Sequence, residues 1–110
     1  MLLPNAGRAV IEPNKVRDYL LSASHPIGRF KATVFAALGY GTDRWDVLRD
    51  DLLSLARTHP AAPGQPSPFG TKYEVDGVLI GPTGKSMTFR TVWIVRAEEE
   101  APRFVTAFPR

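Results

Sequence analysis

The hydrophobic pattern divides the chain into two halves. Up to residue 57, apolar residues recur at spacings of three and four, which is typical of amphipathic helices. From residue 69 onward, apolar and polar residues alternate, which is typical of strands with one buried face. The pattern therefore predicts an α+β domain in which two to three N-terminal helices pack on a C-terminal three-stranded antiparallel meander.

The first half contains residues that suit helix starts. Pro13 fits the first turn of one helix, and Pro26 fits that of a second helix near residues 26–38. A third helix begins at Thr42 or Asp43, whose side chains can cap it. The predicted apolar stripes are Val16, Tyr19 and Leu20 in the first helix, Ile27, Phe30, Val34 and Leu38 in the second, and Trp45, Leu48, Leu52 and Leu55 in the third.

A proline-rich segment separates the halves. Residues 58–68 contain four of the ten prolines, a density that neither a helix nor a central strand tolerates. An exposed loop is predicted there. A single domain over residues 1–110 then has a helical half (1–57), this loop (58–68) and the meander (69–109).

Composition narrows the chemistry. The chain has no cysteine and only two histidines, which excludes disulfides, thiolate metal sites and a cysteine nucleophile. The carboxylates are scattered, so neither a metal nor another cofactor is expected. A net charge of +3 permits a polyanionic partner without requiring one. No signal peptide or membrane segment stands out, so the expected compartment is the cytoplasm, without membrane contact.

The second predicted helix carries the strongest chemical signal. Lys31 falls at about 40° from Ile27 on a helical projection, inside the apolar arc. Either its ammonium group snorkels at the rim or it is held inside, where it would bind an anionic substrate. His25 lies at the start of this helix, where the helix dipole favours neutral imidazole, a general base; an exposed capping histidine is the alternative. Free N–H groups near Gly28 also offer an anion site.

The strands add hydroxyls and cations. Thr91 and Thr106 interrupt two apolar strand faces, either as ordinary strand residues or as hydroxyls that share a site with Lys31. Lys72, Arg90 and Arg103 form either a solvated face or a basic sheet surface.

Several blocks resemble a bacterial family of small domains of unknown function. They are Leu3–Asn5, His25–Ala32, Gly70–Val75, Thr91–Val95 and Pro102–Pro109. Members of that family occur free-standing and at the C-terminal tips of polymorphic toxins. The order of helices before a meander, together with the closing run Val105–Pro109, also resembles the barnase, colicin and RelE group of endoribonucleases.

The second resemblance implies a metal-independent endoribonuclease toxin, neutralised by a cognate antitoxin or immunity protein. A base would deprotonate a ribose 2′-OH, which attacks the adjacent phosphate of RNA. His25 would be the base or acid and Lys31 the cation that stabilises the phosphate, while Thr91 and Thr106 would orient it. The implied RNA-binding residues are Gly28, Arg29, Lys72, Arg90 and Arg103.

The alternative belongs to another class of protein. The domain could be a non-catalytic protein-binding module that pairs with a small partner from the same operon. On that hypothesis His25, Gly28 and Lys31 only fix the start of a helix.

Overall fold

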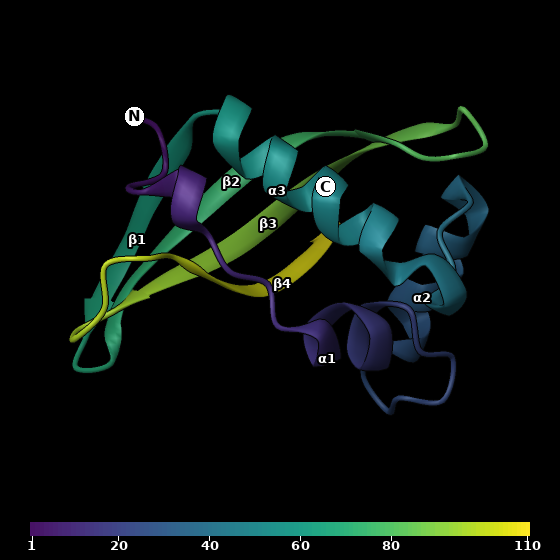
Figure 1. The fold of residues 1–110 in the computed structure, drawn as a ribbon, viewed down its shortest axis with the longest axis horizontal. Coiled ribbons are helices and arrows are strands. Elements are labelled where there is room, and N and C mark those ends of the chain that lie inside the picture. Colours follow the sequence, from purple (N-terminus) through teal and green to yellow (C-terminus); the bar gives the residue numbers. More distant parts are fainter.

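Alternating burial along the strands produces a sheet with one covered face. The computed structural model describes residues 1–110, and its strands pair antiparallel in the order β1-β2-β3-β4 (Figure 1). The helices cover one face of this sheet, as the α+β prediction expected. The strands are β1 (Ala61–Ser67), β2 (Gly70–Ile80), β3 (Ser86–Arg96) and β4 (Arg103–Pro109).

Most of the helical elements are short, and none has the length and apolarity that a membrane crossing requires. Helix α3 lies across the sheet, while α1, η2 and α2 lie on the β4 side of the molecule (Figure 1). The elements are the 3-10 turn η1 (Ala6–Arg8), α1 (Pro13–Lys15), the π-helical turn η2 (Val16–Leu20), α2 (Arg29–Leu38), the 3-10 turn η3 (Thr42–Arg44) and α3 (Trp45–Thr58).

The sheet has four strands, so the predicted three-stranded meander was wrong. The additional strand, β1, lies within residues 58–68, which were predicted to be an exposed loop. Proline lacks the N–H that a strand donates to its neighbour, but β1 is an edge strand and needs donors on one side only. Its register with β2 shifts between Pro63 and Pro66, so the pairing accommodates the prolines by an irregularity.

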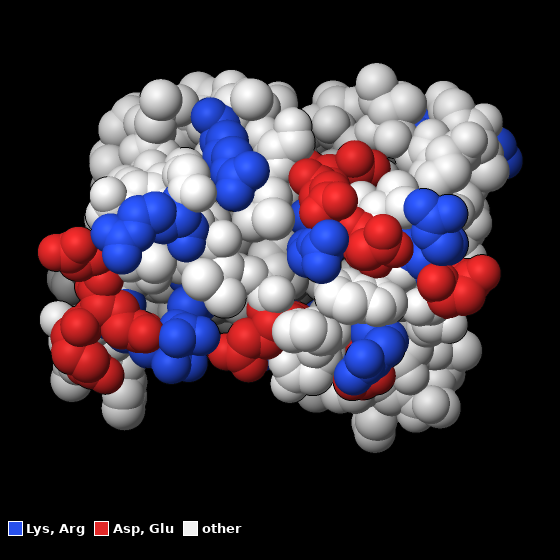
Figure 2. Space-filling model, in the orientation of Figure 1, with Lys and Arg blue, Asp and Glu red and all other residues white.

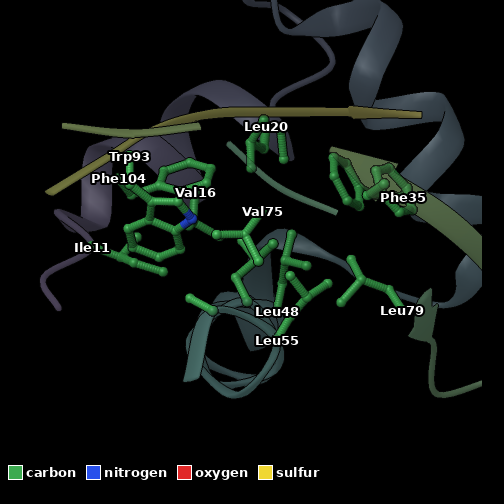
Figure 3. Close-up of a cluster of buried hydrophobic side chains, with 14 of the residues drawn as sticks. Ile11, Val16, Leu20, Phe35, Leu48, Leu55, Val75, Leu79, Trp93 and Phe104 are labelled. Carbon is green, nitrogen blue, oxygen red and sulfur yellow. The ribbon is translucent and has the colours of Figure 1, made fainter. Parts of the chain in front are cut away.

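The core lies between α3 and the covered face of the sheet. Leucines 48, 52 and 55 of α3 are buried against Val75 and Leu79 of β2, and Trp93 of β3 is fully buried beside them (Figure 3). The ring of Phe35 from α2 stacks on that of Phe89, with centroids 5.0 Å apart. One continuous core therefore joins the helical half to the sheet.

Helix α2 buries a different stripe from the predicted one. Ile27 and Phe30 are 65% and 69% exposed, whereas Ala32, Phe35 and Leu38 are buried. The helix begins at Arg29, so Ile27 precedes it and does not belong to its face. Lys31 is half-buried and precedes the buried Phe35 and Leu38 by four and seven residues, so it lies on the side of α2 that faces the core.

A glycine allows η2 to pack against the start of α2. A Cβ atom on Gly28 would lie 1.9 Å from the carbonyl oxygen of Tyr19, a contact that only backbone movement could relieve. Gly28 is buried, so its place in the structure is explained by this close packing. The lack of a side chain at Gly28 therefore determines how closely Tyr19 approaches α2.

Replacing Gly28 by alanine should separate η2 from α2. We expect Gly28→Ala to lower the free energy of unfolding by about 1–3 kcal/mol, a cost typical of overpacking, as measured by urea denaturation. The matched control is Gly7→Ala, because no atom lies within 4 Å of a Cβ there, and it should change stability by about 0.5 kcal/mol or less. Equal stability of the two variants would show that the contact at Tyr19 yields freely.

Candidate functional site

Three polar side chains from three different elements meet beside the middle of β4. The Nζ atom of Lys31 on α2 donates hydrogen bonds to the hydroxyl of Tyr19 on η2 and to Oγ1 of Thr106 on β4, both at 2.7 Å. The two hydroxyl oxygens are 3.2 Å apart and hydrogen bond to each other. We call Tyr19, Lys31 and Thr106 the hydroxyl–lysine cluster.

The charge of Lys31 is not neutralised within the protein. Its hydrogen-bond acceptors are two hydroxyl groups, and it forms no ion pair. Asp18, the carboxylate beside Tyr19, instead forms two hydrogen bonds of 2.9 Å with Arg17. The half-buried ammonium also lies 4.9 Å from the centroid of the Tyr19 ring. An unpaired, partly desolvated cation of this kind favours binding of an anion.

The same contacts change the acidity of Tyr19. Burial alone raises the pKa of the Tyr19 phenol, but hydrogen bonds with Lys31 and Thr106 lower it. The positive charges of Lys31 and Lys15 lower it further, so the pKa falls below the ordinary tyrosine value. Tyr19 is therefore better able than an ordinary tyrosine to give up or exchange a proton.

His25 lies in the turn before α2, next to Tyr19. Its Nδ1 atom accepts hydrogen bonds from the backbone N–H groups of Ile27 and Gly28, both at 3.0 Å. The imidazole meets the Tyr19 ring edge to face, with centroids 5.1 Å apart. Because Nδ1 acts as an acceptor, a neutral imidazole in this geometry carries its proton on Nε2. His25 is then placed as a hydrogen-bond donor.

A pocket of about 570 Å³ opens where these residues meet. His25, Tyr19 and Thr106 belong to its wall, and Lys31 is linked to it through the two hydroxyls. The full lining is Asn14, Lys15, Asp18, Tyr19, His25, Ile27, Val105 and Thr106. The structure thus brings together His25, Lys31 and Thr106 from the predicted catalytic set. Gly28 is buried and donates its N–H to His25, so this N–H is not available to the anion that the sequence predicted it would bind.

Thr91 is not part of this pocket. It is fully buried in the core, where its hydroxyl donates to the carbonyl oxygen of Val75 and accepts from Nε1 of Trp93, both at 2.8 Å. The hydroxyl satisfies the indole N–H, which would otherwise be buried without a partner. The prediction from strand alternation identified a buried threonine correctly but could not separate a core role from a site role.

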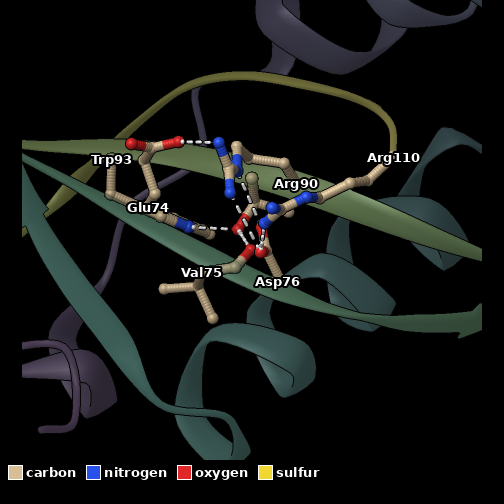
Figure 4. Close-up of polar contacts among 7 residues, drawn as sticks. Glu74, Val75, Asp76, Arg90, Trp93 and Arg110 are labelled. Carbon is tan, nitrogen blue, oxygen red and sulfur yellow. Dashed lines mark hydrogen bonds and ion pairs between the residues drawn. The ribbon is translucent and has the colours of Figure 1, made fainter.

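Two of the predicted RNA-binding arginines form ion pairs. Arg90 contacts Glu74 at 2.7 Å and Asp76 at 2.9 Å, and Arg110 adds a further contact to Asp76 (Figure 4). Arg103 contacts Glu99 at 2.9 Å and Glu12 at 3.0 Å. Their charges are compensated, so they do not form the basic sheet surface that the sequence suggested.

The remaining predicted cations lie apart. Lys72 is exposed in a groove on the uncovered face of the sheet, and the guanidinium of Arg29 lies 4.9 Å from the centroid of the Phe30 ring. On the face shown in Figure 2, positive and negative groups are interleaved without one sign prevailing. Near the pocket, the positive charges are those of Lys15 in its wall and of Lys31 behind the two hydroxyls.

Sequence reasoning missed Tyr19 and Lys15 as site residues. Tyr19 was assigned to an apolar stripe. Its hydroxyl was the one signal that could have indicated a polar contact, because a buried phenol usually has a hydrogen-bond partner. Lys15 lies on α1 at the pocket wall. No group of three or more histidine, aspartate or glutamate side chains is placed to hold a metal ion.

The low pKa of Tyr19 can be measured by titrating the tyrosines. We expect ultraviolet absorbance at the tyrosinate band to show one of the three tyrosines ionising below the ordinary value of about 10. Lys31→Met should raise the pKa of that group, since it removes a hydrogen bond and a positive charge. Lys85→Met, in the exposed β2–β3 turn, is the control. An unchanged titration in Lys31→Met would contradict the assignment.

Comparison with known proteins supports the fold. No curated protein matches this chain closely enough to indicate homology. A solved structure, the contact-dependent growth inhibition toxin–immunity protein complex from Klebsiella pneumoniae 342, contains a chain with the same fold. The two chains align over 96% of each with a TM-score of 0.70, at 19% sequence identity.

The family is shown by a match over nearly the whole chain. The model for the domain of unknown function DUF6883 matches residues 2–110. That range includes every element of the fold and every residue of the pocket. The chain therefore belongs to the DUF6883 family.

Proposed function

We propose that this domain is a metal-independent endoribonuclease of a toxin that acts on RNA in the cytoplasm. The observation that carries the proposal is the unneutralised ammonium of Lys31, held by two hydroxyls at the wall of a pocket that His25 also lines. Cleavage of RNA requires a proton acceptor, a cation for the developing phosphorane charge and donors that orient the phosphate. The cluster and His25 together contain a candidate for each role.

The first step is attack by the ribose 2′-OH. Tyr19 is the candidate base: its lowered pKa increases the fraction present as phenolate, and that form accepts the 2′-OH proton while the O2′–P bond forms. Lys31 stabilises both the phenolate and the negative charge that develops on the phosphorane. The Nε2–H group of His25 donates a hydrogen bond to a phosphate oxygen, while the one proton of the Thr106 hydroxyl is donated to the Tyr19 phenolate.

The second step releases the 5′ oxygen. The P–O5′ bond breaks, and the proton held by Tyr19 passes to the leaving oxygen. The products are a 2′,3′-cyclic phosphate and a 5′-hydroxyl, with no net change in the protonation of the protein. Every proton is supplied and recovered within the cluster, so a metal-bound water has no role in this sequence.

The partner proposed for this toxin is a cognate antitoxin or immunity protein. The toxin–immunity complex from Klebsiella pneumoniae, whose fold this chain shares, supports a role in such a system. That complex contains both a toxin and an immunity protein, so the shared fold is compatible with a toxin domain and with a protein that binds one. Activity on RNA separates the two.

Purified protein should degrade RNA in the presence of EDTA. Lys31→Ala should reduce the rate about 100- to 1000-fold, as is typical when a group that stabilises transition-state charge is removed. The matched control is Lys85→Ala, which removes one positive charge from the exposed β2–β3 turn and should retain full activity. Gel analysis of RNA fragments and their 2′,3′-cyclic ends provides the measurement. Intact RNA after incubation with the unaltered protein would refute the ribonuclease proposal.

Two substitutions at His25 separate its two contacts. In His25→Asn the side-chain oxygen can take the place of Nδ1 and keep the N–H bonds from Ile27 and Gly28, but the donor at the Nε2 position is lost. We expect normal thermal stability with cleavage reduced about 100-fold. His25→Gln keeps a donor near Nε2 and gives up the turn contacts, so it should retain more activity and lose stability. The reverse order would make His25 a purely structural residue.

A non-catalytic binding module is the second candidate. It is favoured by one observation, that the hydroxyl–lysine cluster ties η2, α2 and β4 together and so could serve the fold alone. On this hypothesis Lys31→Ala lowers stability, and neither the variant nor the unaltered protein cleaves RNA. Stability and RNA cleavage measured on the same preparations distinguish the candidates.

A further inference from the structure

The outer edges of the sheet carry residues that oppose pairing with another strand. β1 contains Pro63 and Pro66, and β4 ends at Pro109. Prolines on an edge remove backbone donors and so prevent unwanted strand addition. One stretch is different: β1 pairs with β2 only as far as Val75, which leaves Asp76–Ile80 of β2 without a neighbouring strand on that side.

The backbone of this stretch has unpaired groups. Gly81 donates its N–H to the carbonyl of Lys85, so the odd-numbered residues of β2 hydrogen bond to β3 in the antiparallel ladder. The N–H and C=O groups of Val78 and Ile80 therefore point away from β3, toward the free edge. We call residues 76–80 the free edge of β2.

The side chains of the free edge are apolar and accessible. Val78 is 51% exposed and Ile80 66% exposed, and both are β-branched residues that pack well against a neighbouring strand. The stretch from Asp76 to Ile80 contains no proline and no lysine. Asp76 forms ion pairs with Arg90 and Arg110, so its negative charge is compensated and does not oppose the approach of another strand. An exposed apolar edge without such protection is typical of strand addition by a partner.

A hollow of about 210 Å³ lies between the free edge and α3. Asp51 is the one acidic residue in its lining; it accepts a hydrogen bond of 2.6 Å from Tyr40 and has no cationic partner. The hollow therefore complements a basic side chain. Its lining is Asp51, Ser54, Leu55, Thr58, His59, Val78, Leu79 and Ile80.

We propose that the free edge of β2 binds an extended segment of a partner protein as a fifth strand. Apolar residues of that segment cover Val78 and Ile80, and a lysine or arginine between them reaches the hollow beside Asp51. An extended peptide is the ligand whose alternating donors and acceptors match those of an unpaired strand. A second copy of this chain fits less well, because its own free edge offers no basic side chain to Asp51.

The proposal is independent of the proposed ribonuclease activity and is tested by peptide binding. The probe is the capped peptide Val-Lys-Val-Lys-Val, titrated into ¹⁵N-labelled full-length protein. We expect saturable shifts of the amide signals of Val78 and Ile80, with slower exchange of those amides with solvent. The peptide Val-Glu-Val-Glu-Val should bind about fivefold more weakly, since it replaces attraction to Asp51 by repulsion.

Two variants locate the interaction. Val78→Pro removes an N–H that points to the free edge and leaves the β3 ladder intact, so binding should be lost; Val78→Thr keeps that N–H and should bind normally. If Val78→Pro is poorly folded by circular dichroism, Asp51→Asn is the second test, and it should reduce the preference for the lysine peptide.

Three outcomes would overturn the proposal. One is an absence of saturable shifts at millimolar lysine peptide, and another is shifts confined to the groove around Phe69 and Lys72. The third is a dimer in sedimentation that Val78→Pro abolishes, because the occupant of the free edge would then be a second copy of the chain.

Discussion

An ammonium group that lies on the core-facing side of a helix needs hydrogen-bond acceptors. The arrangement around the pocket depends on the two acceptors of Lys31, the hydroxyl groups of Tyr19 and Thr106. Helix α2 packs through Phe35 and Leu38, so Lys31 on the same face is carried toward the sheet. Its acceptors come from a π-helical turn and from an edge strand, and both must stand at hydrogen-bond distance. Gly28 makes that possible, because any side chain there would displace Tyr19. The positions of the three side chains and the lowered pKa of Tyr19 thus depend on one buried contact, between the backbones of Gly28 and Tyr19.

The choice of hydroxyls over carboxylates as acceptors has a chemical consequence. A carboxylate beside Lys31 would stabilise the fold equally well but would cancel its charge. Two other cations of the predicted site, Arg90 and Arg103, do form ion pairs with carboxylates, which compensate their charges. Lys31 keeps its charge, and it lowers the pKa of the phenol that holds it. In the proposed mechanism, an available cation beside a more acidic phenol supports proton transfer next to a phosphate.

The sequence predicted the α+β class and the order of helices before strands, because the hydrophobic pattern has a different period in helices and in strands. It predicted the apolar stripe of α2 less well, since Ile27 and Phe30 are exposed and the buried residues are Ala32, Phe35 and Leu38. It failed where a residue's partner lies far along the chain. Tyr19 and Thr106 are 87 residues apart, and no local pattern indicates that their hydroxyls meet. Proline density likewise predicted a loop at 58–68, since propensity does not say that a strand will lie at an edge, where missing donors cost little. Thr91 and Thr106 alternate alike in their strands, yet only a register shift in the pairing of β3 with β4 puts Thr106 opposite Val92 and at the pocket.

The free edge of β2 and the pocket beside the hydroxyl–lysine cluster lie toward opposite edges of the sheet. Strand order places the free edge of β2 on the β1 side, whereas Thr106 and the pocket belong to β4. A strand added at β2 would therefore extend the sheet away from the pocket and leave it open. A partner that closed the pocket would have to reach around the sheet or bind the pocket directly. Binding at the free edge alone would leave the hydroxyl–lysine cluster accessible, so the two surfaces can be occupied at the same time.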